Sequence, residues 1–334
     1  MSKREDDFYL PSYVNIELTN HCNMRCIICP HGHNLVKDKG YMEFDVYKKI
    51  IDELWECKEF NPDRVNLVGV GESLLHPQFI DMANYLKKTN YVRDLVTNAY
   101  FLTPDKSDEI IVTEALDIIE ISFDTMKEEF EKFKGGKIYQ TVMNNIEYFI
   151  KKNKKIQVRI VFIQYDMEME NLIISQELKS KFSSPLVFFT GFNVSSWRGT
   201  LELSFLSDEA RKKVEQKLRD TPVNKKCSNG ANLGMFSWDG TLRSCYLDYN
   251  RQHIFGNVKD SNTIDLLLSD ERKQFVDNIY DGKPWENFIC KDCLSPYNAA
   301  NQELVLETAN ERIKAEGSMW EVMKEMKYLQ KKDH

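Results

Sequence analysis

The sequence predicts an α/β protein whose main unit is a partial (β/α)6 barrel, and three observations support that fold class. Apolar runs of strand length alternate with amphipathic helical stretches over the first 200 residues, as in repeated βα units around a parallel sheet. Only six such strands fit there, whereas a closed eight-stranded barrel typically needs about 250 residues. After Asn193 the pattern changes to a hairpin with helices, which predicts a smaller second module and then a helical tail.

The six expected strands of the barrel are short apolar runs. They are Tyr13–Leu18, Arg64–Val70, Val92–Thr97, Ile118–Phe123, Lys155–Ile163 and Pro185–Asn193. In a parallel sheet of this kind, the chemistry lies in the loops that follow the C-terminal ends of the strands. Functional residues are therefore expected directly after these runs.

Helical patterns fill the gaps between the strands. Phe44–Phe60 shows the pattern most clearly, because its apolar residues Val46, Ile50, Ile51 and Leu54 recur with a spacing near 3.6 residues. The other expected helices are Pro77–Lys88, Asp105–Leu116, Tyr139–Asn153 and Glu170–Phe182. This alternation of strands and helices indicates repeated βα units.

The second module has a different order of elements. The expected elements are a helix at Ser207–Asp220, a hairpin at Met235–Cys245 and a helix at Thr263–Tyr280. Asp239-Gly240 is the tight-turn pair of the hairpin. From Asn298 the chain is rich in Lys and Glu and reads as helix, interrupted at Gly317. We therefore expect the barrel at residues 1–200, the second module at residues 201–297 and the helical tail at residues 298–334.

Charge and hydropathy exclude several classes of partner. The chain has 45 Lys and Arg against 52 Asp and Glu, a net charge of −7, which argues against non-specific nucleic-acid binding. No run approaches the ~18–20 apolar residues that span a bilayer. Met1–Asp7 is charged and lacks an apolar signal segment. These features predict a cytoplasmic protein that binds neither nucleic acid nor membranes.

Eight cysteines are too few for a disulfide scaffold in a chain of 334 residues, and cytoplasmic thiols more often bind metal. The first group is Cys22, Cys26 and Cys29, in the spacing C-x3-C-x2-C directly after the first strand. Three thiolates can hold three irons of a [4Fe–4S] cube and leave the fourth iron open to an exogenous ligand. The alternative is a zinc site completed by a neighbouring histidine, namely His21, His31 or His33.

Four more cysteines lie in the second module. They are Cys227, Cys245, Cys290 and Cys293, which come from the hairpin and from a tight C-x2-C knuckle. On spacing alone, a structural zinc site and a fully ligated [4Fe–4S] cluster fit equally well. The remaining cysteine, Cys57, is expected to be a small packing residue.

The first cysteine segment resembles the signature of radical S-adenosylmethionine (SAM) enzymes, and the resemblance extends over the expected barrel. At the end of the second strand, Gly71-Glu72 resembles the family's Gly-Gly-Glu motif, with Val70 in place of the first glycine. The resemblance implies that this segment receives the methionine ammonium group of SAM. Gly71 would allow close backbone approach, and Glu72 would supply an acceptor near the cation.

Further positions follow the family pattern at the strand ends. Asn98 ends the third strand in a Thr-Asn turn, and Ser122 and Asp124 end the fourth strand as a Ser-x-Asp motif. Ile28 stands before the third cysteine, where the family usually has an aromatic residue. The resemblance implies that these four residues contact SAM, with Ile28 packing on the adenine ring and Ser122 near the ribose.

The second cysteine group resembles the auxiliary-cluster module that follows the barrel in many radical SAM enzymes. The larger form of this module, SPASM, has seven cysteines for two clusters, whereas four cysteines match the shorter twitch form with one cluster. The spacing is similar to that of 2-deoxy-scyllo-inosamine dehydrogenases. The resemblance therefore implies two [4Fe–4S] clusters, one that binds SAM and one in a C-terminal hairpin-plus-helix auxiliary iron–sulfur module.

The resemblance also implies a reaction, in which a 5′-deoxyadenosyl radical from SAM abstracts a substrate hydrogen atom. Because the auxiliary cluster would accept the second electron, the expected enzyme is a radical SAM dehydrogenase. It would oxidise a secondary alcohol of a sugar, an aminocyclitol or a related metabolite to a ketone. Arg198, after the sixth strand, is the expected substrate contact at the barrel mouth, and the alternative is a salt bridge near the junction with the second module.

The expected partners are a small-molecule substrate and an electron donor such as flavodoxin or ferredoxin. The tail is compatible with capping the barrel, forming a homodimer or binding a partner. Three other functions stay open: peptide modification by crosslinking or epimerisation, sugar epimerisation, and non-catalytic metal binding or electron transfer. The N-terminal peptide-binding domain of many peptide modifiers is not expected, because the first strand begins at Tyr13.

Overall fold

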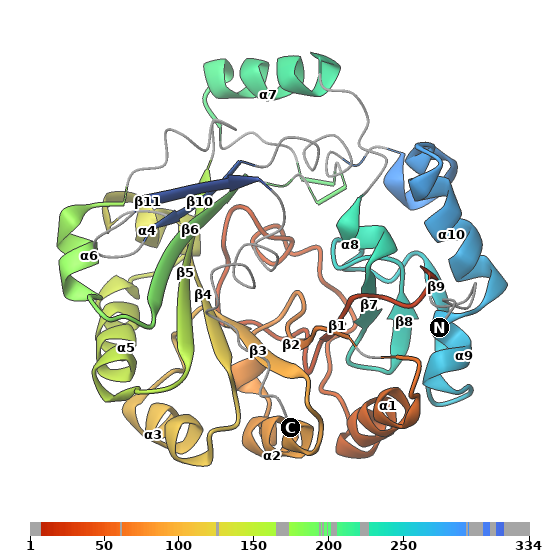
Figure 1. The fold of residues 1–334 in the computed structure, drawn as a ribbon. Coiled ribbons are helices and arrows are strands. Elements are labelled where there is room, and N and C mark those ends of the chain that lie inside the picture. The colour runs from red at the N-terminus through yellow and green to blue at the C-terminus, as the bar shows by residue number, and fades with distance from the viewer. Residues whose placement is uncertain are drawn as a thin grey trace.

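The computed structural model describes residues 8–60, 62–124, 127–164, 174–193, 195, 197–198, 200–201, 206–220, 227–291, 293, 303–307 and 312–316. Its strands form one 11-stranded sheet in the order β11-β10-β6-β5-β4-β3-β2-β1-β7-β8-β9 (Figure 1). Strands β1 to β6 pair in parallel with one another. Because β1 and β6 do not pair in this order, the sheet stays open, and the predicted partial barrel is confirmed.

The barrel strands alternate with helices that lie on the outside of the curved sheet (Figure 1). The strands are β1 Tyr13–Ile16, β2 Arg64–Leu67, β3 Val92–Thr97, β4 Ile118–Asp124, β5 Gln157–Gln164 and β6 Val187–Asn193. The helices are α1 Phe44–Glu56, α2 Phe79–Tyr85, α3 Pro104–Thr113, α4 Lys127–Lys134, α5 Tyr139–Lys152 and α6 Gln176–Lys181, with short 3-10 turns η2 Ser73–Leu75 and η3 Leu86–Lys88. The expected helix at Glu170–Phe182 is therefore α6, and residues 165–173 lie outside the described part.

The two faces of the barrel sheet differ in polarity because successive side chains of a strand point to opposite faces. Val14 and Ile16 are fully buried in the main hydrophobic core, together with apolar residues of the helices. Asn15, Asn66 and Asp94 occupy one row across β1, β2 and β3. The Asn66 side chain donates a hydrogen bond to Asn15 Oδ1 at 2.6 Å, so this row pairs internally.

Helix α4 has no counterpart among the predicted helices. Six of its eight residues are charged, and its apolar residues are Phe130 and Phe133, both of which are buried. Two apolar residues give too little periodicity to identify a helix, and most helical stability in proteins comes from tertiary packing. The packing of these two rings therefore stabilises α4 as a helix. The C-terminal end of α4 supports the first cysteine group, as described below.

The second module continues the same sheet. Its elements are α7 Asp208–Asp220, α8 Ser228–Ala231, β7 Leu233–Phe236, β8 Thr241–Arg243, β9 Ile254–Asn257, α9 Thr263–Leu267, α10 Asp270–Tyr280, η5 Pro284–Glu286 and η6 Phe288–Cys290. The predicted hairpin is β7 and β8, and β7 pairs in parallel with β1. The predicted helix at Thr263–Tyr280 is two helices, because the Ser269 hydroxyl caps α10 by accepting a hydrogen bond from Arg272 N at 3.4 Å.

The described part of the tail differs from the predicted helix. Residues 303–307 and 312–316 form strands β10 Glu303–Glu307 and β11 Arg312–Glu316, which pair antiparallel with each other. Strand β10 also pairs antiparallel with β6. An open sheet edge presents a row of unpaired backbone groups, and these segments add strands to it. The other tail residues lie outside the described part. Within the described residues, no helix has the length and apolar character needed to cross a membrane.

Candidate metal centres

The first cysteine group lies in the loop directly after β1. The loop turns back on itself: Cys29 N donates to Cys26 O at 3.0 Å, and Gly32 N donates to Cys29 O at 2.9 Å. The three thiols of Cys22, Cys26 and Cys29 are partly buried and close enough to influence one another electrostatically. The structure therefore brings the three predicted ligands of the first site together.

The C-terminal end of α4 supports this loop. Arg25 N donates to Lys134 O at 3.2 Å, and Ile27 N donates to Phe133 O at 2.9 Å. These are carbonyl groups of the last helical turn, which have no partner within the helix. Gly135 follows with φ +79°, and a Cβ there would lie 2.8 Å from Arg25 O. The loop and the end of α4 therefore fix each other through backbone contacts.

Burial controls the acidity of the thiols in this loop. It raises the pKa of the Cys22 thiol to about 12, and it also raises the pKa of Cys26 and Cys29. A thiol with such a pKa is a poor free nucleophile at neutral pH, because the thiolate is the reactive form. A bound metal ion deprotonates a coordinating thiol outright. The surroundings therefore suit metal ligands better than a catalytic cysteine.

The Gly71-Glu72 segment packs directly on the cysteine loop. Glu72 N donates to His21 O at 2.8 Å, and a Cβ on Gly71 would lie 2.2 Å from Thr19 O. The Glu72 carboxylate is buried, and burial raises its pKa. It accepts hydrogen bonds from Thr97 Oγ1 at 2.8 Å, Asn98 N at 2.8 Å and Leu74 N at 3.1 Å. Glu72 thus ties the end of β3 to the cysteine loop, in addition to any contact with a ligand.

Replacing Gly71 with Ala should disturb the first cysteine group. The added methyl group would overlap backbone atoms of the loop, which cannot swing aside like a flexible side chain, and such overpacking typically costs about 1–3 kcal/mol. We expect a lower unfolding midpoint and incomplete iron incorporation. The matched control is Gly136→Ala, where an added Cβ would lie 3.8 Å from Ile138 Cγ2, an ordinary van der Waals contact. Equal iron content and midpoint in both variants would contradict the prediction.

Asn98 lies where the family pattern places it, beside the first cysteine group. Its Nδ2 is 4.0 Å from Cys22 Sγ and donates to Asn23 Oδ1 at 3.0 Å. Its Oδ1 accepts from Tyr100 N at 3.0 Å, which fixes the orientation of the amide. Hydrogen bonds to cluster sulfurs are one of the factors that set cluster potentials. Asn98 is therefore placed to act on the first site through Cys22.

Ser122 and Asp124, at the end of β4, meet a buried lysine that the sequence did not single out. Lys134 Nζ donates to Ser122 O at 2.7 Å and to Asp124 Oδ2 at 2.6 Å. Lys134 is 2% exposed, and its charge acts on Cys26 and Cys22. The sequence did not indicate that Lys134 is buried, because this lysine is the last residue of a highly charged helix. A lysine in such a position is ordinarily exposed to solvent.

Ile28 is held through its carbonyl group. The indole nitrogen of Trp197 donates to Ile28 O at 2.7 Å. Trp197 follows β6 and lies far from Ile28 in the sequence, so the contact could not be read from either motif. It joins the first cysteine loop to the segment that also carries Arg198.

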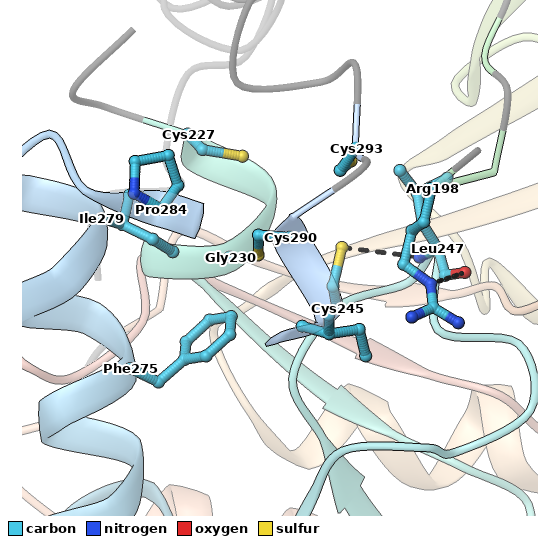
Figure 2. Close-up of a pocket in the computed structure, with 11 residues that line it drawn as sticks. Arg198, Cys227, Gly230, Cys245, Leu247, Phe275, Ile279, Pro284, Cys290 and Cys293 are labelled. Carbon is cyan, nitrogen blue, oxygen red and sulfur yellow. Dashed lines mark hydrogen bonds between the residues drawn. The ribbon is translucent and has the colours of Figure 1, made fainter. Parts of the chain in front are cut away.

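The four cysteines of the second group surround one small cavity, as Figure 2 shows. Cys227 directly precedes α8, Cys245 follows β8, and Cys290 and Cys293 form the knuckle after η5. Burial raises the pKa of Cys245 and Cys290, and the neighbouring thiols add to this effect. The cavity is also lined by apolar side chains such as Phe275 and Ile289. The structure thus gathers the four predicted ligands around one small cavity with a mainly apolar lining.

Arg198 lies against this second group, and its expected role as a substrate contact stays a prediction (Figure 2). Its Nη2 is 3.3 Å from Asp248 Oδ1 and donates to Gln252 Oε1 at 3.0 Å. Its Nε donates to Leu247 O at 3.2 Å. The side chain is 7% exposed, and that of Asp248 is fully buried. The contact with Asp248 is the salt bridge near the junction with the second module that the sequence indicated as the alternative for Arg198.

A second buried ion pair connects the module to the barrel. Arg243 Nη2 donates to Glu17 Oε2 at 3.0 Å, and the two side chains are 0% and 1% exposed. Glu17 also accepts a hydrogen bond from Val70 N at 2.8 Å, and Arg243 Nη1 donates to Asp248 O at 2.9 Å. Arg243 is two residues before Cys245, and Glu17 lies between β1 and the first cysteine loop. This pair therefore fixes the two cysteine-bearing segments to each other.

Replacing Arg243 with Met should destabilise the fold strongly. The change leaves the Glu17 carboxylate buried without its cation, and breaking a buried pair in this way costs roughly 3–5 kcal/mol. Lys106→Met is the control, because it removes the partly exposed pair with Glu109, and such pairs contribute at most about 1 kcal/mol. Chemical denaturation followed by circular dichroism gives both values. A loss for Arg243→Met no larger than for the control would show that the pair adds nothing.

The residue types at both sites fit iron–sulfur groups, which are held by thiolates. The histidines of the zinc alternative have other surroundings: His33 Nε2 is 2.8 Å from Ile27 O, and His21 stacks on Tyr41 with a centroid distance of 4.7 Å. Burial lowers the pKa of His31 to about 4, which keeps its ring in the neutral form that can bind a metal, and its buried Nε2 has no hydrogen-bond partner within the described residues. Within the described residues, no three His, Cys, Asp or Glu side chains stand ready to hold a single metal ion. The donors are thiols alone, three at the first site and four at the second.

Two protein-family models match the chain. The Radical SAM superfamily matches residues 16–173, and the SPASM iron–sulfur cluster-binding domain matches residues 227–294. The first match contains the first cysteine group and the strand-end motifs, and the second contains all four cysteines of the second group.

The chain is also similar to curated proteins. The chain is 24% identical over 309 residues to the tungsten-containing aldehyde ferredoxin oxidoreductase cofactor-modifying protein of Pyrococcus furiosus, which covers 85% of this chain and 85% of the relative. It is 29% identical over 182 residues to the GTP 3′,8-cyclase of Limosilactobacillus fermentum, which covers 52% of this chain and 53% of the relative.

Solved structures share the fold. BtrN in complex with AdoMet and 2-DOIA has a TM-score of 0.56 and 17% identity, and the match covers 85% of this chain and 93% of BtrN. SuiB of Streptococcus suis bound to the precursor peptide SuiA has a TM-score of 0.60 and 13% identity, and the match covers 86% of this chain and 71% of SuiB. At these identities the likeness concerns the fold.

Proposed function

The chain is a radical SAM enzyme with a SPASM-type iron–sulfur domain, and from this premise we propose that it oxidises a secondary alcohol to a ketone. The proposed substrate is a sugar, an aminocyclitol or a related hydroxylated metabolite. The proposed cofactors are SAM and two [4Fe–4S] clusters, one at Cys22, Cys26 and Cys29 and one auxiliary cluster at the second cysteine group. A flavodoxin or ferredoxin is the proposed electron donor.

The observation that carries this proposal is the closed set of four thiols around one buried cavity. Four thiolates can ligate all four irons of a cube, which leaves no coordination position for substrate. Electron acceptance is then the natural role of the second site. The first site has three thiols and an adjacent Gly71-Glu72 segment, which suits a cluster with one open iron and SAM beside it.

When bound, SAM at a reduced cluster supplies a radical that removes a hydrogen atom, and a fully ligated cluster supplies an acceptor for the remaining electron. The balance is one SAM and one secondary alcohol giving one methionine, one 5′-deoxyadenosine, one ketone and one proton. The chain's own residues hold and orient these groups. Glu72 and Asn98 fix the loop around Cys22, and Arg198 places a guanidinium beside the auxiliary thiols, where it offsets their negative charge as thiolates.

The test of this function uses anaerobically reconstituted, reduced enzyme with a panel of polyols deuterated at their carbinol carbons. We expect deuterium in 5′-deoxyadenosine from one class of sugar or cyclitol, with a ketone formed in equal amount. Label transfer without a ketone would indicate epimerisation instead. No transfer from any sugar or cyclitol, but transfer from a peptide, would overturn the proposed substrate class.

A second candidate is peptide modification, and the likeness to SuiB bound to its precursor peptide favours it. Two observations favour a small molecule instead. The matches to BtrN and to the Pyrococcus furiosus relative each cover 85% or more of both chains; BtrN was solved with 2-DOIA, and the relative is named as a cofactor-modifying protein. The deuterium experiment above separates the two candidates when labelled peptides are included in the panel.

A further inference from the structure

Trp197 lies between the two cysteine groups. On one side it packs against an apolar cluster of Val36, Val70 and Tyr249, to which Cys29 also belongs as a partly buried member. On the other side it packs against a cluster formed by Cys245, Leu247 and Cys293. Within the described residues, these two clusters share this one side chain. Its ring is therefore in position to act on the first and the second site together.

Aromatic neighbours hold the indole ring in place. Its centroid is 6.1 Å from that of Tyr249 and 6.4 Å from that of Tyr246, and both pairs meet edge to face. This arrangement is favourable for aromatic pairs. Tyr246 directly follows Cys245, so the second ligand segment is part of the same packing. The orientation of the ring is thus set by both clusters.

The polar end of the same side chain reaches the first site. The indole nitrogen donates to Ile28 O at 2.7 Å, and Ile28 directly precedes Cys29. A short hydrogen bond of this kind fixes the position of the peptide group between two predicted cluster ligands. The side chain therefore fixes one loop through a hydrogen bond and the other through packing.

The backbone at Trp197 is held in an unfavourable conformation. Trp197 and Arg198 have φ values of +49° and +63°, which non-glycine residues rarely adopt. Trp197 N donates to Ser195 Oγ at 3.2 Å, and Thr200 Oγ1 donates to Trp197 O at 2.6 Å. Strained residues of this kind persist where the surroundings fix them and are frequent at functional sites. The strain directs the Trp197 and Arg198 side chains to their contacts.

We propose that Trp197 is a positioning residue that sets the geometry of both metal centres relative to each other. This inference rests on the proposed function only in requiring a cluster at each cysteine group. Through Ile28, Trp197 would position the loop that SAM contacts. Through the cluster around Cys245, it would set the surroundings of the auxiliary centre.

Trp197→Phe and Trp197→Leu test the proposal in the reconstituted full-length enzyme. Trp197→Phe removes the hydrogen bond to Ile28 O and keeps most of the ring, so we expect SAM affinity to fall roughly three- to ten-fold, the range for one hydrogen bond. Trp197→Leu also removes the ring, and we expect changes in the electron paramagnetic resonance signals of both reduced clusters and in the spin–spin interaction between them. Iron content and circular dichroism establish that the variants are loaded and folded.

Trp55→Phe is the matched control, because Trp55 lies on α1, is 40% exposed and belongs to neither of the two apolar clusters that contain Trp197. It should leave all readouts unchanged. Wild-type SAM affinity and unchanged spectra in Trp197→Phe would overturn the proposal, even if Trp197→Leu fails to fold. None of these measurements uses the alcohol substrate, so a failure of the proposed oxidation would be seen separately.

Discussion

Replacing Cys26 with Ala is expected to remove the first cluster and with it all cleavage of SAM. Cys26 is the central ligand of the loop, and its carbonyl also accepts the hydrogen bond from Cys29 N. Loss of a direct ligand should cost more than the roughly 10–100-fold in affinity or activity that follows loss of an outer-shell partner. We therefore expect iron content to fall from roughly eight to roughly four per chain, and 5′-deoxyadenosine to fall to background.

The control for this variant is Cys57→Ala. Cys57 follows α1, and its sulfur is 3.9 Å from Glu59 Oε2, a contact unrelated to either cysteine group. Iron content and 5′-deoxyadenosine formation should match the wild type. If Cys26→Ala retained a full iron content and SAM cleavage, the assignment of the first site would be wrong.

Replacing Cys290 with Ala should separate the two halves of the reaction. Cys290 lines the cavity of the second group and lies outside the loop that holds the first group. Loss of a thiolate opens an iron of the auxiliary cluster or prevents its assembly, which removes the electron acceptor. We expect SAM cleavage to continue while the yield of oxidised product per 5′-deoxyadenosine falls by more than the roughly 10–100-fold typical of an outer-shell change.

The measurement compares 5′-deoxyadenosine and ketone in the same reaction, once the deuterium experiment has identified a substrate. The Cys290→Ala variant also has a readout without substrate, because its iron content should fall to roughly four per chain while the SAM-responsive spectroscopic signal remains. Unchanged coupling between the two products would show that the second site is structural. Loss of SAM cleavage together with ketone would show that the two sites do not act separately.

Much of the barrel could be predicted because its signals are local. Strand β3 has the predicted bounds, and the helix predicted at Tyr139–Asn153 is found as α5 at Tyr139–Lys152. Helix α5 buries Val142, Met143, Ile146 and Phe149 at helical spacing, so its periodicity survives in the sequence. The tail is the opposite case, because its Lys and Glu content favours helix, while pairing with the open edge at β6 makes β10 and β11 strands.

Some residues of the candidate site could likewise be predicted from local patterns, and others could not. The seven predicted ligand cysteines were found by spacing, because short loops and knuckles impose fixed intervals on their ligands. Lys134 was missed because a lysine at the end of a charged helix is ordinarily solvated, and here it is 2% exposed and paired with Asp124. Arg198 was singled out from the sequence, but its salt bridge to Asp248 beside the second cysteine group joins residues 50 positions apart and could not be read from a local pattern.

The fold class and the two groups of cysteines could be predicted from intervals along the chain, and the motifs at the strand ends carry the resemblance to radical SAM enzymes. How the two groups are connected depends on tertiary contacts, namely the Glu17–Arg243 pair, the Arg198–Asp248 pair and the side chain of Trp197. Such contacts join residues far apart in the sequence. They form because folding buries these side chains together in one protein interior. A local sequence pattern therefore cannot identify the partner of a residue when that partner lies far away along the chain.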